Sequence, residues 1–227
     1  MTITTKKPQY SVLAILIFGC VVLAYLDGFA HPPFWTKSAI KVLLFVGIPL
    51  GYSYFTKDPF YRPLFALDKK ALALAMGLGF GVIAVILGAF FALGELLDLS
   101  AVVGELESAM AVTAENFIAV ALYIAIFNSF FEEFFFRGFA FFQLKKYYSR
   151  TTAHVISSTL FSLYHVAIIA FWFDLWVFVL CLVGLVVGGV IFNLLDESTH
   201  SIYPSWLTHA CANLALNSIG MMLFYGN

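Results

Sequence analysis

The chain has 227 residues, of which 62% are hydrophobic and only 11% are charged, and its mean hydropathy is +0.95. This composition excludes an ordinary soluble domain, in which close to half of the residues are apolar and about a quarter are charged. Twelve Lys and Arg against thirteen Asp and Glu give a net charge of −1, which offers no basic surface for nucleic acid and excludes it as a partner. We therefore expect an all-α polytopic bundle of about seven to eight spans, forming a single integral membrane domain over residues 1–227.

Seven apolar runs have about the length of a transmembrane helix, and breaks rich in Asp, Gly and Pro separate them. In chain order they cover residues 10–26, 39–55, 71–93, 117–144, 153–173, 175–195 and 203–225. Lys6 and Lys7 precede the first run and Gly28-Phe29-Ala30 follows it, so a cleaved signal peptide is an alternative there. The many apolar runs that follow favour an uncleaved first span.

An acidic segment and the distribution of cations bear on topology. Residues 94–116 mix Glu and Asp with Leu, Val and Met, which predicts an interfacial amphipathic helix or a loop; the acidic residues are Glu95, Asp98, Glu105, Glu107 and Glu115. With a cytoplasmic N-terminus, Lys37 and Lys41 are the cations expected on the outer side. Nine cations then lie inside, namely Lys6, Lys7, Lys57, Arg62, Lys69, Lys70, Lys145, Lys146 and Arg150. This asymmetry predicts a cytoplasmic N-terminus.

The fourth run carries ionisable residues that a bilayer tolerates only when they are paired or functional. Glu133 and Arg137 are four residues apart, in the order that favours an ion pair on one helix face. Glu132 points about 100° away around the helix, and Phe136 stands where an i+4 partner would be. We therefore expect Glu133 and Arg137 to support the site structurally, and Glu132 to be unpaired and available for chemistry.

Two later runs place imidazole and carboxamide groups at membrane depth. His165 ends the sequence Phe161-Ser162-Leu163-Tyr164-His165, and a hydrogen bond to a neighbouring helix would also account for it. His209 and Asn213 share one helix face through their i, i+4 spacing. Asn217 lies one turn further along and is interpreted as an interhelical hydrogen-bonding residue.

These residues have the composition of a buried hydrolytic site drawn from three helices. Glu132 is the candidate general base that takes a proton from water, and His165 would hold or share that water. His209 and Asn213 could donate hydrogen bonds to the oxyanion of a tetrahedral intermediate. No cofactor is expected. Zinc bound by Glu132, His165 and His209 is the chemical alternative, although the H-E-x-x-H helix is absent.

The ordered motifs Glu132-Glu133-x-x-x-Arg137, Phe161-x-x-x-His165 and His209-x-x-x-Asn213 resemble those of the CPBP family. Its members, also called Abi proteins, are CAAX proteases and bacteriocin-processing proteins, and the resemblance extends to type II CAAX prenyl endopeptidases. It covers the motif-bearing core, about residues 117–220. The resemblance implies a helical intramembrane endopeptidase in which Glu132 and His165 activate water and His209 and Asn213 form the oxyanion site.

The resemblance also implies a membrane-associated peptide or protein substrate, and the short chain looks like the bacterial members, in the cell membrane. A non-catalytic membrane scaffold or bacteriocin self-immunity protein is the second hypothesis, because the polar cluster could serve packing alone. A transporter is the third, since buried Glu and His also form proton relays. The sequence specifies neither the substrate nor the oligomeric state.

Overall fold

The computed structural model describes residues 8–94, 99, 102–104, 106–107, 112–170 and 172–226. These residues form helices and no strand, and seven of their helices are long and apolar enough to cross a membrane. The seven are Pro8–Ala30, Phe34–Thr56, Lys69–Leu93, Phe117–Leu144, Arg150–Ile169, Leu175–Thr199 and Tyr203–Tyr225. The predicted all-α polytopic class is therefore confirmed, with seven spans in the described part of the chain.

Several spans are built from consecutive helical elements, some of them π-helical. The first two spans comprise α1 (Pro8–Tyr25) and η1 (Leu26–Ala30), then α2 (Phe34–Val42), η2 (Leu43–Gly47) and α3 (Ile48–Thr56). A short helix η3 (Arg62–Phe65) precedes α4 (Lys69–Leu93). The fourth span comprises α6 (Phe117–Tyr123), η5 (Ile124–Asn128), α7 (Ser129–Glu133), η6 (Phe134–Phe141) and α8 (Phe142–Leu144). The last elements are α9 (Arg150–Tyr164), α10 (Val166–Ile169), α11 (Leu175–Thr199) and α12 (Tyr203–Tyr225).

About half of the segment 94–116 lies outside the described residues. Glu95, Asp98 and Glu105 are among the residues not described, as are Lys6 and Lys7. The interfacial helix expected for this segment therefore stays a prediction.

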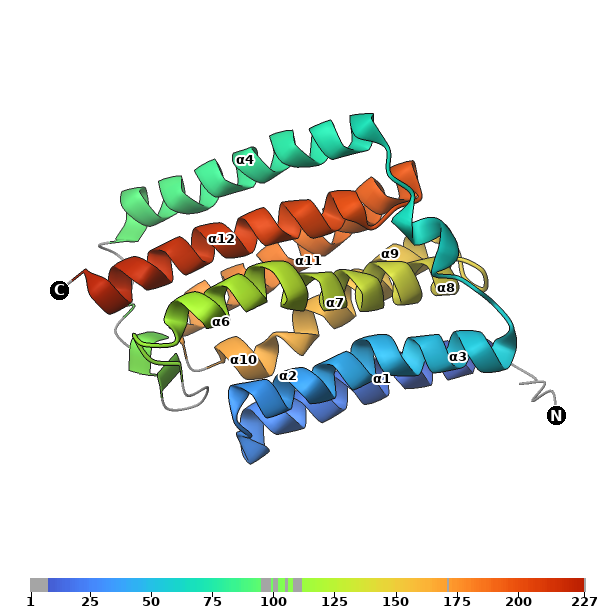
Figure 1. Cartoon of the computed structure of the whole chain (residues 1–227), viewed down its shortest axis with the longest axis horizontal. Helices are drawn as coiled ribbons and strands as arrows, with labels where there is room; N and C mark the ends of the chain where they lie inside the picture. Colours follow the sequence, from blue (N-terminus) through green and yellow to red (C-terminus); the bar gives the residue numbers. More distant parts are fainter. Residues whose placement is uncertain are drawn as a thin grey trace.

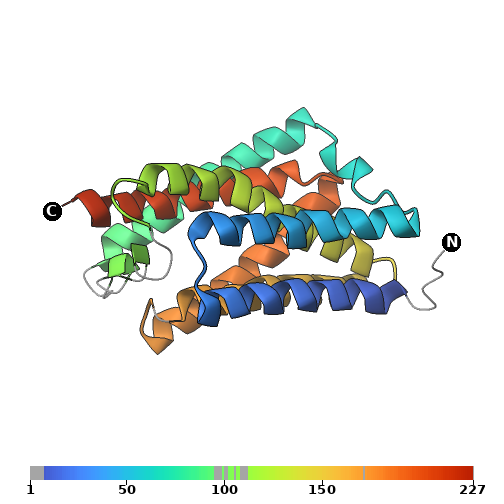
Figure 2. The same ribbon diagram turned by 60° about the horizontal axis from the view of Figure 1, so that its bottom comes forward.

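The fourth span runs through the middle of the bundle, between two groups of helices. Helix α12 packs along α4 on one side, and α9 packs against α11 (Figure 1). Helices α1 and α2, the latter continued by α3, run antiparallel on the opposite side (Figure 2). Helix α1 begins at one end of the bundle and α12 ends at the other (Figure 1), as an odd number of spans requires.

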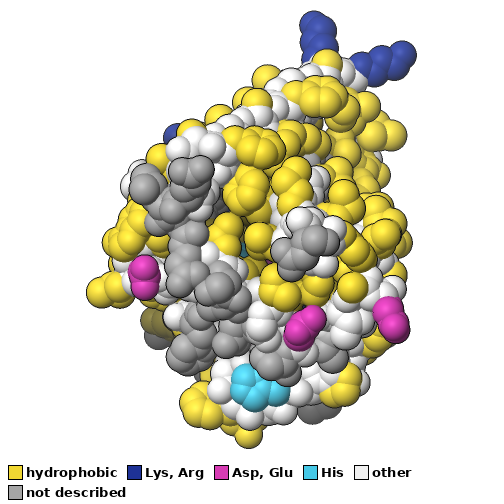
Figure 3. All heavy atoms as spheres, turned by 90° about the vertical axis from the view of Figure 1, so that its left-hand side faces the viewer, with side chains coloured by type: hydrophobic (Ala, Val, Ile, Leu, Met, Phe, Trp, Pro, Cys, Tyr) yellow, Lys and Arg dark blue, Asp and Glu magenta, His cyan; other side chains and the backbone are white. Residues whose placement is uncertain are grey.

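The outer surface of the bundle is apolar, whereas its interior holds charged groups. Val85, Phe91 and Leu175 are each at least 70% exposed, while Glu133 and Arg137 are fully buried. On the end of the bundle drawn in Figure 3, hydrophobic side chains cover most of the described surface and charged ones are sparse. This distribution is typical of helices surrounded by lipid. The chain is an integral membrane protein.

Helix α12 approaches α4 closely because one of the facing residues is glycine. A Cβ atom built on Gly79 of α4 would lie 2.6 Å from Sγ of Cys211, on α12. That separation is far inside van der Waals contact, so a larger residue at position 79 would push α12 away. Cys211 lies between His209 and Asn213, so this contact fixes the part of α12 that carries the motif.

A polar contact outside the spans ties the segment after α3 to the end of the fourth span. Oδ2 of Asp58 accepts hydrogen bonds from Nζ of Lys146 at 2.5 Å and from Nε2 of Gln143 at 3.0 Å. Partial burial alone would raise the pKa of Asp58, but the hydrogen bonds from Lys146 and Gln143 and the charge of Lys146 together lower it below its usual value. The ionised carboxylate thus favours the folded state.

Because this pKa is lower in the folded state than in the unfolded one, the contribution of Asp58 is present above about pH 3.9 and is lost on further acidification. We expect Asp58→Asn to lower the melting temperature by a few degrees at most at pH 7, since partly exposed pairs contribute under about 1 kcal/mol. The difference from the wild type should shrink toward pH 3. Thermal unfolding in detergent across this range checks it, and a constant difference would contradict the assignment.

Candidate active site

Glu132 and Glu133 lie in α7, in the middle of the central span. The π-helical segments η5 and η6 flank α7 on both sides, and π-helical turns, which hydrogen-bond from residue i to i+5, occur often at functional sites. The two glutamates are 2% and 0% exposed. Carboxylates buried this deeply require partners, and the two side chains find different ones.

The Glu132 carboxylate is held through one of its two oxygens. Oε1 accepts hydrogen bonds from Nζ of Lys41 and Nδ2 of Asn128, both at 2.8 Å, and from the Tyr164 hydroxyl at 3.3 Å. The prediction that Glu132 is unpaired is therefore wrong. The i+4 rule sees only partners on the same helix, whereas Lys41 comes from α2.

The second oxygen of Glu132 faces two imidazoles. No described residue donates a hydrogen bond to Oε2, and Nε2 of His165 and Nε2 of His209 each lie 3.8 Å from it. This distance is too long for a direct hydrogen bond but is one that a single water molecule can bridge. The structure thus brings together Glu132, His165 and His209 from three spans, as expected from the sequence, while their catalytic roles stay predictions.

His165 lies at the C-terminal end of α9, where the chain turns into α10. Its Nδ1 is 2.7 Å from the carbonyl oxygen of Phe161, one turn earlier in the same helix. A carbonyl only accepts hydrogen bonds, so Nδ1 must carry the proton. In the neutral ring, Nε2 therefore directs its lone pair toward Glu132. The partner is a backbone group of its own helix rather than a neighbouring helix.

His209, in the second turn of α12, contacts both glutamates. Its Nδ1 lies 2.7 Å from Oε1 of Glu133, and its Nε2 faces Glu132. The Glu133 carboxylate accepts a hydrogen bond from Nδ1–H and so fixes both the tautomer and the orientation of the ring. This modifies the predicted oxyanion role, because Nε2 of His209 can donate a hydrogen bond only when the ring carries both protons.

The predicted pair between Glu133 and Arg137 is present. NH1 of Arg137 lies 3.2 Å from Oε1 of Glu133, and both side chains are fully buried. The guanidinium carbon lies 4.1 Å from the ring centroid of Phe161 and 5.0 Å from that of Phe192. A planar cation between aromatic faces gains cation–π attraction, so Arg137 links the central span to α9 and α11.

Asp196 fixes the start of α12, a role that local spacing does not reveal. It is fully buried near the end of α11, and its carboxylate accepts hydrogen bonds from the backbone N–H of Ser205 at 3.2 Å and from its hydroxyl at 2.7 Å. Ser205 lies in the first turn of α12, where backbone N–H groups have no partner within the helix. Asp196 thereby anchors the end of the helix that carries His209.

Asn213 and Asn217 both bond to the backbone of the fourth span. Nδ2 of Asn217 donates to the carbonyl oxygen of Ala121 at 2.9 Å, which confirms its interpretation as an interhelical residue. Nδ2 of Asn213 donates to the carbonyl oxygen of Ile124 at 3.3 Å. Within the described residues, no hydrogen bond joins Asn213 to the Glu132 carboxylate. Its place in an oxyanion site stays a prediction.

The donor set suits zinc in kind but not in spacing. Glu132, His165 and His209 offer one carboxylate and two imidazoles, each imidazole with its Nδ1 held by another group, as at many zinc sites. Tetrahedral coordination at zinc would place the ligand atoms about 3.3 Å apart, whereas Oε2 lies 3.8 Å from each Nε2. No group of three or more His, Cys, Asp or Glu among the described residues has the arrangement of a metal site.

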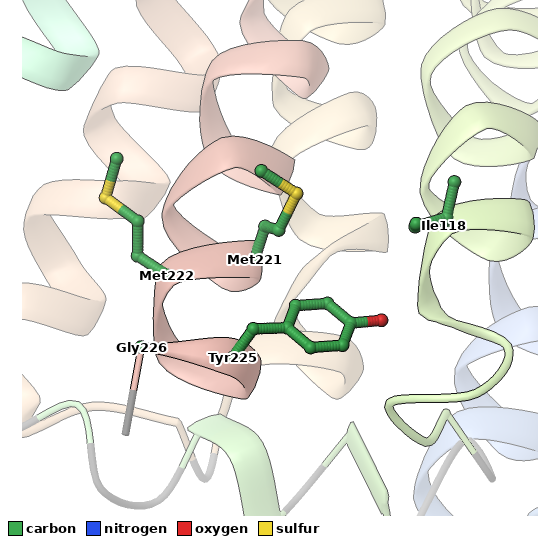
Figure 4. A pocket seen from close by; sticks show the side chains of 5 residues that line it. All are labelled: Ile118, Met221, Met222, Tyr225 and Gly226. Carbon is green, nitrogen blue, oxygen red and sulfur yellow. The ribbon is translucent and has the colours of Figure 1, made fainter.

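A shallow apolar depression at the far end of α12 lies apart from these groups. Its volume is about 420 Å³, and α6 and α12 line it with Ile118, Met221, Met222, Tyr225 and Gly226. The ring of Tyr225 extends from α12 toward α6 (Figure 4). Met221 lies twelve positions after His209, about 18 Å along a helix. Its lining contains no carboxylate or imidazole, so it adds nothing to the chemistry of the site.

The site and the fold together define a class of protein: a polytopic helical membrane protein with glutamate and histidine converging inside the bundle. Residues 114–215 match the model of the family described as type II CAAX prenyl endopeptidase Rce1-like. This region contains Glu132, His165 and His209, and the match confirms the resemblance to CAAX proteases over these residues. No curated protein and no solved structure matches the chain significantly.

The buried pair of Glu133 and Arg137 makes a testable prediction about stability. Arg137→Ala leaves the Glu133 carboxylate buried without its cation, which costs about 3–5 kcal/mol. We expect a melting temperature lower by roughly 10 °C, together with a low yield. Thermal unfolding in detergent measures this.

Arg150→Ala is the matched control, because Arg150 also pairs with a glutamate, Glu197, but its side chain is 61% exposed. That change should lower the melting temperature only slightly, because exposed ion pairs contribute little to stability. Adding Glu133→Gln to Arg137→Ala should recover part of the lost stability. Equal effects of the two arginine substitutions would contradict the structural role of Arg137.

Proposed function

We propose that this chain is an intramembrane endopeptidase that hydrolyses a peptide bond of a membrane-associated peptide or protein, using water activated by Glu132. The observation that carries the proposal is the free oxygen Oε2 of Glu132, which faces Nε2 of His165 and Nε2 of His209 inside an apolar bundle. The match of residues 114–215 to the model of a protease family supports the reaction class.

The proposed reaction begins with a water molecule between Glu132 and His165. Oε2 of Glu132 accepts a proton from this water, and the hydroxyl oxygen attacks the carbonyl carbon of the substrate peptide bond. The carbonyl oxygen becomes an oxyanion. The proton taken by Glu132 then passes to the leaving nitrogen as the C–N bond breaks, so one water yields one carboxylic acid and one amine.

His209 and Asn213 are the proposed partners of the oxyanion. His209 would donate from Nε2 in its doubly protonated form, with the Glu133 carboxylate 2.7 Å from Nδ1 to balance the positive charge. Asn213 lies one turn further along α12 and has a second amide hydrogen beyond the one directed at Ile124. Glu133 and Arg137 support the site by fixing the His209 ring.

We propose metal-independent chemistry, with zinc held by Glu132, His165 and His209 as the chemical alternative. A bound zinc ion would polarise the water and the peptide carbonyl. The alternative function is a non-catalytic scaffold or self-immunity protein, in which the same contacts serve packing only. The two functions differ in whether the Glu132 carboxylate is required.

The decisive change is Glu132→Gln, which keeps the size of the side chain but removes the basic carboxylate. We expect the cleavage rate to fall by at least about 100-fold with the protein still folded, because a neutral amide is easier to bury than a carboxylate. The measurement uses purified protein in liposomes and a quenched library of membrane peptides, with and without a C-terminal prenyl group. A chelator is added in a parallel series.

Glu115→Gln is the matched control, since Glu115 is exposed and lies far from α7 in the chain. Cleavage that is lost in Glu132→Gln but persists with chelator supports the proposal. Cleavage lost with chelator and restored by zinc would replace it with the metal alternative. Full activity of Glu132→Gln, or no cleavage by the wild type of any peptide, would contradict it and favour the scaffold.

We also propose that the protein lies in a bacterial cell membrane with its N-terminus in the cytoplasm. The orientation rests on the nine cations that lie on the cytoplasmic side in this arrangement. Burial of Lys41 within the second span removes one of the two cations expected outside and so strengthens the bias. With seven spans, a reporter fused after Asn227 should be active only outside the cytoplasm. Cytoplasmic activity of that reporter would contradict the orientation.

A further inference from the structure

Lys41 is the buried cation that the motif-based interpretation leaves without a function. It lies in α2, outside the region 114–215 that matches the family, and its side chain is 9% exposed. Burial of a lysine ammonium inside a membrane span is costly unless strong partners surround it. Its partners are therefore informative about what the residue does.

The Lys41 ammonium contacts the site at two points. Nζ donates to Oε1 of Glu132 at 2.8 Å and to Oδ1 of Asn128 at 2.5 Å. Because its carbonyl oxygen faces Lys41, the Asn128 amide directs Nδ2 toward the same carboxylate oxygen, at 2.8 Å. The third side of the ammonium faces the Tyr164 ring, with Nζ 4.9 Å from its centroid.

These contacts all converge on one of the two Glu132 oxygens. With Lys41, Asn128 and Tyr164 bound to Oε1, the carboxylate cannot rotate without losing several hydrogen bonds. Oε2 is consequently held on the side of the two histidines. An aromatic contact one turn after Lys41 holds the second span against the fourth at this level. Phe45 of η2 stacks on Phe135 of η6 with ring centroids 4.1 Å apart.

We propose that Lys41 is a positioning residue of the active site: it orients the Glu132 carboxylate, directly and through Asn128, so that Oε2 faces the reacting water. This inference rests on the proposed function and extends it to a helix outside the matched region. Lys41 balances the charge of the general base and touches neither water nor substrate in this role.

The first test measures coupling between the two side chains and requires no substrate. Lys41→Met and Glu132→Gln are made singly and together, and their melting temperatures in detergent are compared. We expect Lys41→Met to lower the melting temperature by roughly 10 °C, because the Glu132 carboxylate is left without its cation. The decrease in melting temperature of the double variant should be smaller than the sum of the decreases of the two single variants.

Lys37→Met is the matched control on the same helix. Lys37 lies one turn before Lys41 and has its own carboxylate partner, Asp27, at 2.5 Å. Its substitution should show no coupling to Glu132→Gln. Coupling of equal size at both lysines, or at neither, would overturn the proposed contact whether or not the protein is a protease.

The second test separates positioning from packing by steady-state kinetics on a peptide that the wild type cleaves. We expect Lys41→Met, assayed well below its melting temperature, to lower kcat by about 100-fold, as a misplaced catalytic group does, with KM within twofold. Lys37→Met should leave kcat unchanged. An unchanged kcat in Lys41→Met overturns the positioning role alone, whereas absence of cleavage by the wild type overturns the proposed function and this role with it.

Discussion

Burial of ionised groups is the constraint on which this bundle depends. Each such group inside a low-dielectric interior costs several kcal/mol unless an opposite charge or strong hydrogen bonds surround it. The structure meets this constraint by alternating signs: Lys41 pairs with Glu132, and Arg137 pairs with Glu133 and also interacts electrostatically with Asp196. The charges come from three spans, so the ion pairs also determine how those spans pack.

Two adjacent glutamates can serve different purposes because successive residues on a helix face different neighbours. Glu133 uses one oxygen for both Arg137 and His209 and so belongs to the packing of the bundle. Glu132 uses one oxygen for Lys41 and Asn128 and directs the other toward the histidines. The second oxygen therefore faces the two Nε2 atoms, which in neutral rings are hydrogen-bond acceptors like itself. A water molecule between them can donate the hydrogen bonds that these atoms lack.

Local sequence rules predicted what depends on local spacing. Seven apolar runs correspond to the seven spans, and the i, i+4 rule found the ion pair of Glu133 and Arg137. The rule could not find Lys41 as the partner of Glu132, or Asp196 as the anchor of α12, because those contacts join different helices. The position of Lys41 near the end of a predicted span also indicated a surface residue, because a lysine there ordinarily extends to the membrane surface.

Stability and positioning are inseparable in such a core, since the contacts that make burial of a charge tolerable are the same ones that orient it. Loss of activity in a single variant of Lys41 or Arg137 therefore has to be compared with its melting temperature, because an unpaired carboxylate also loosens the bundle. A double substitution that removes both charges leaves no unpaired charge in the bundle and so recovers stability. It does not restore the orientation of the side chains in the site. For Lys41 and Glu132, recovered stability without recovered cleavage is the behaviour expected of groups that serve catalysis as well as packing.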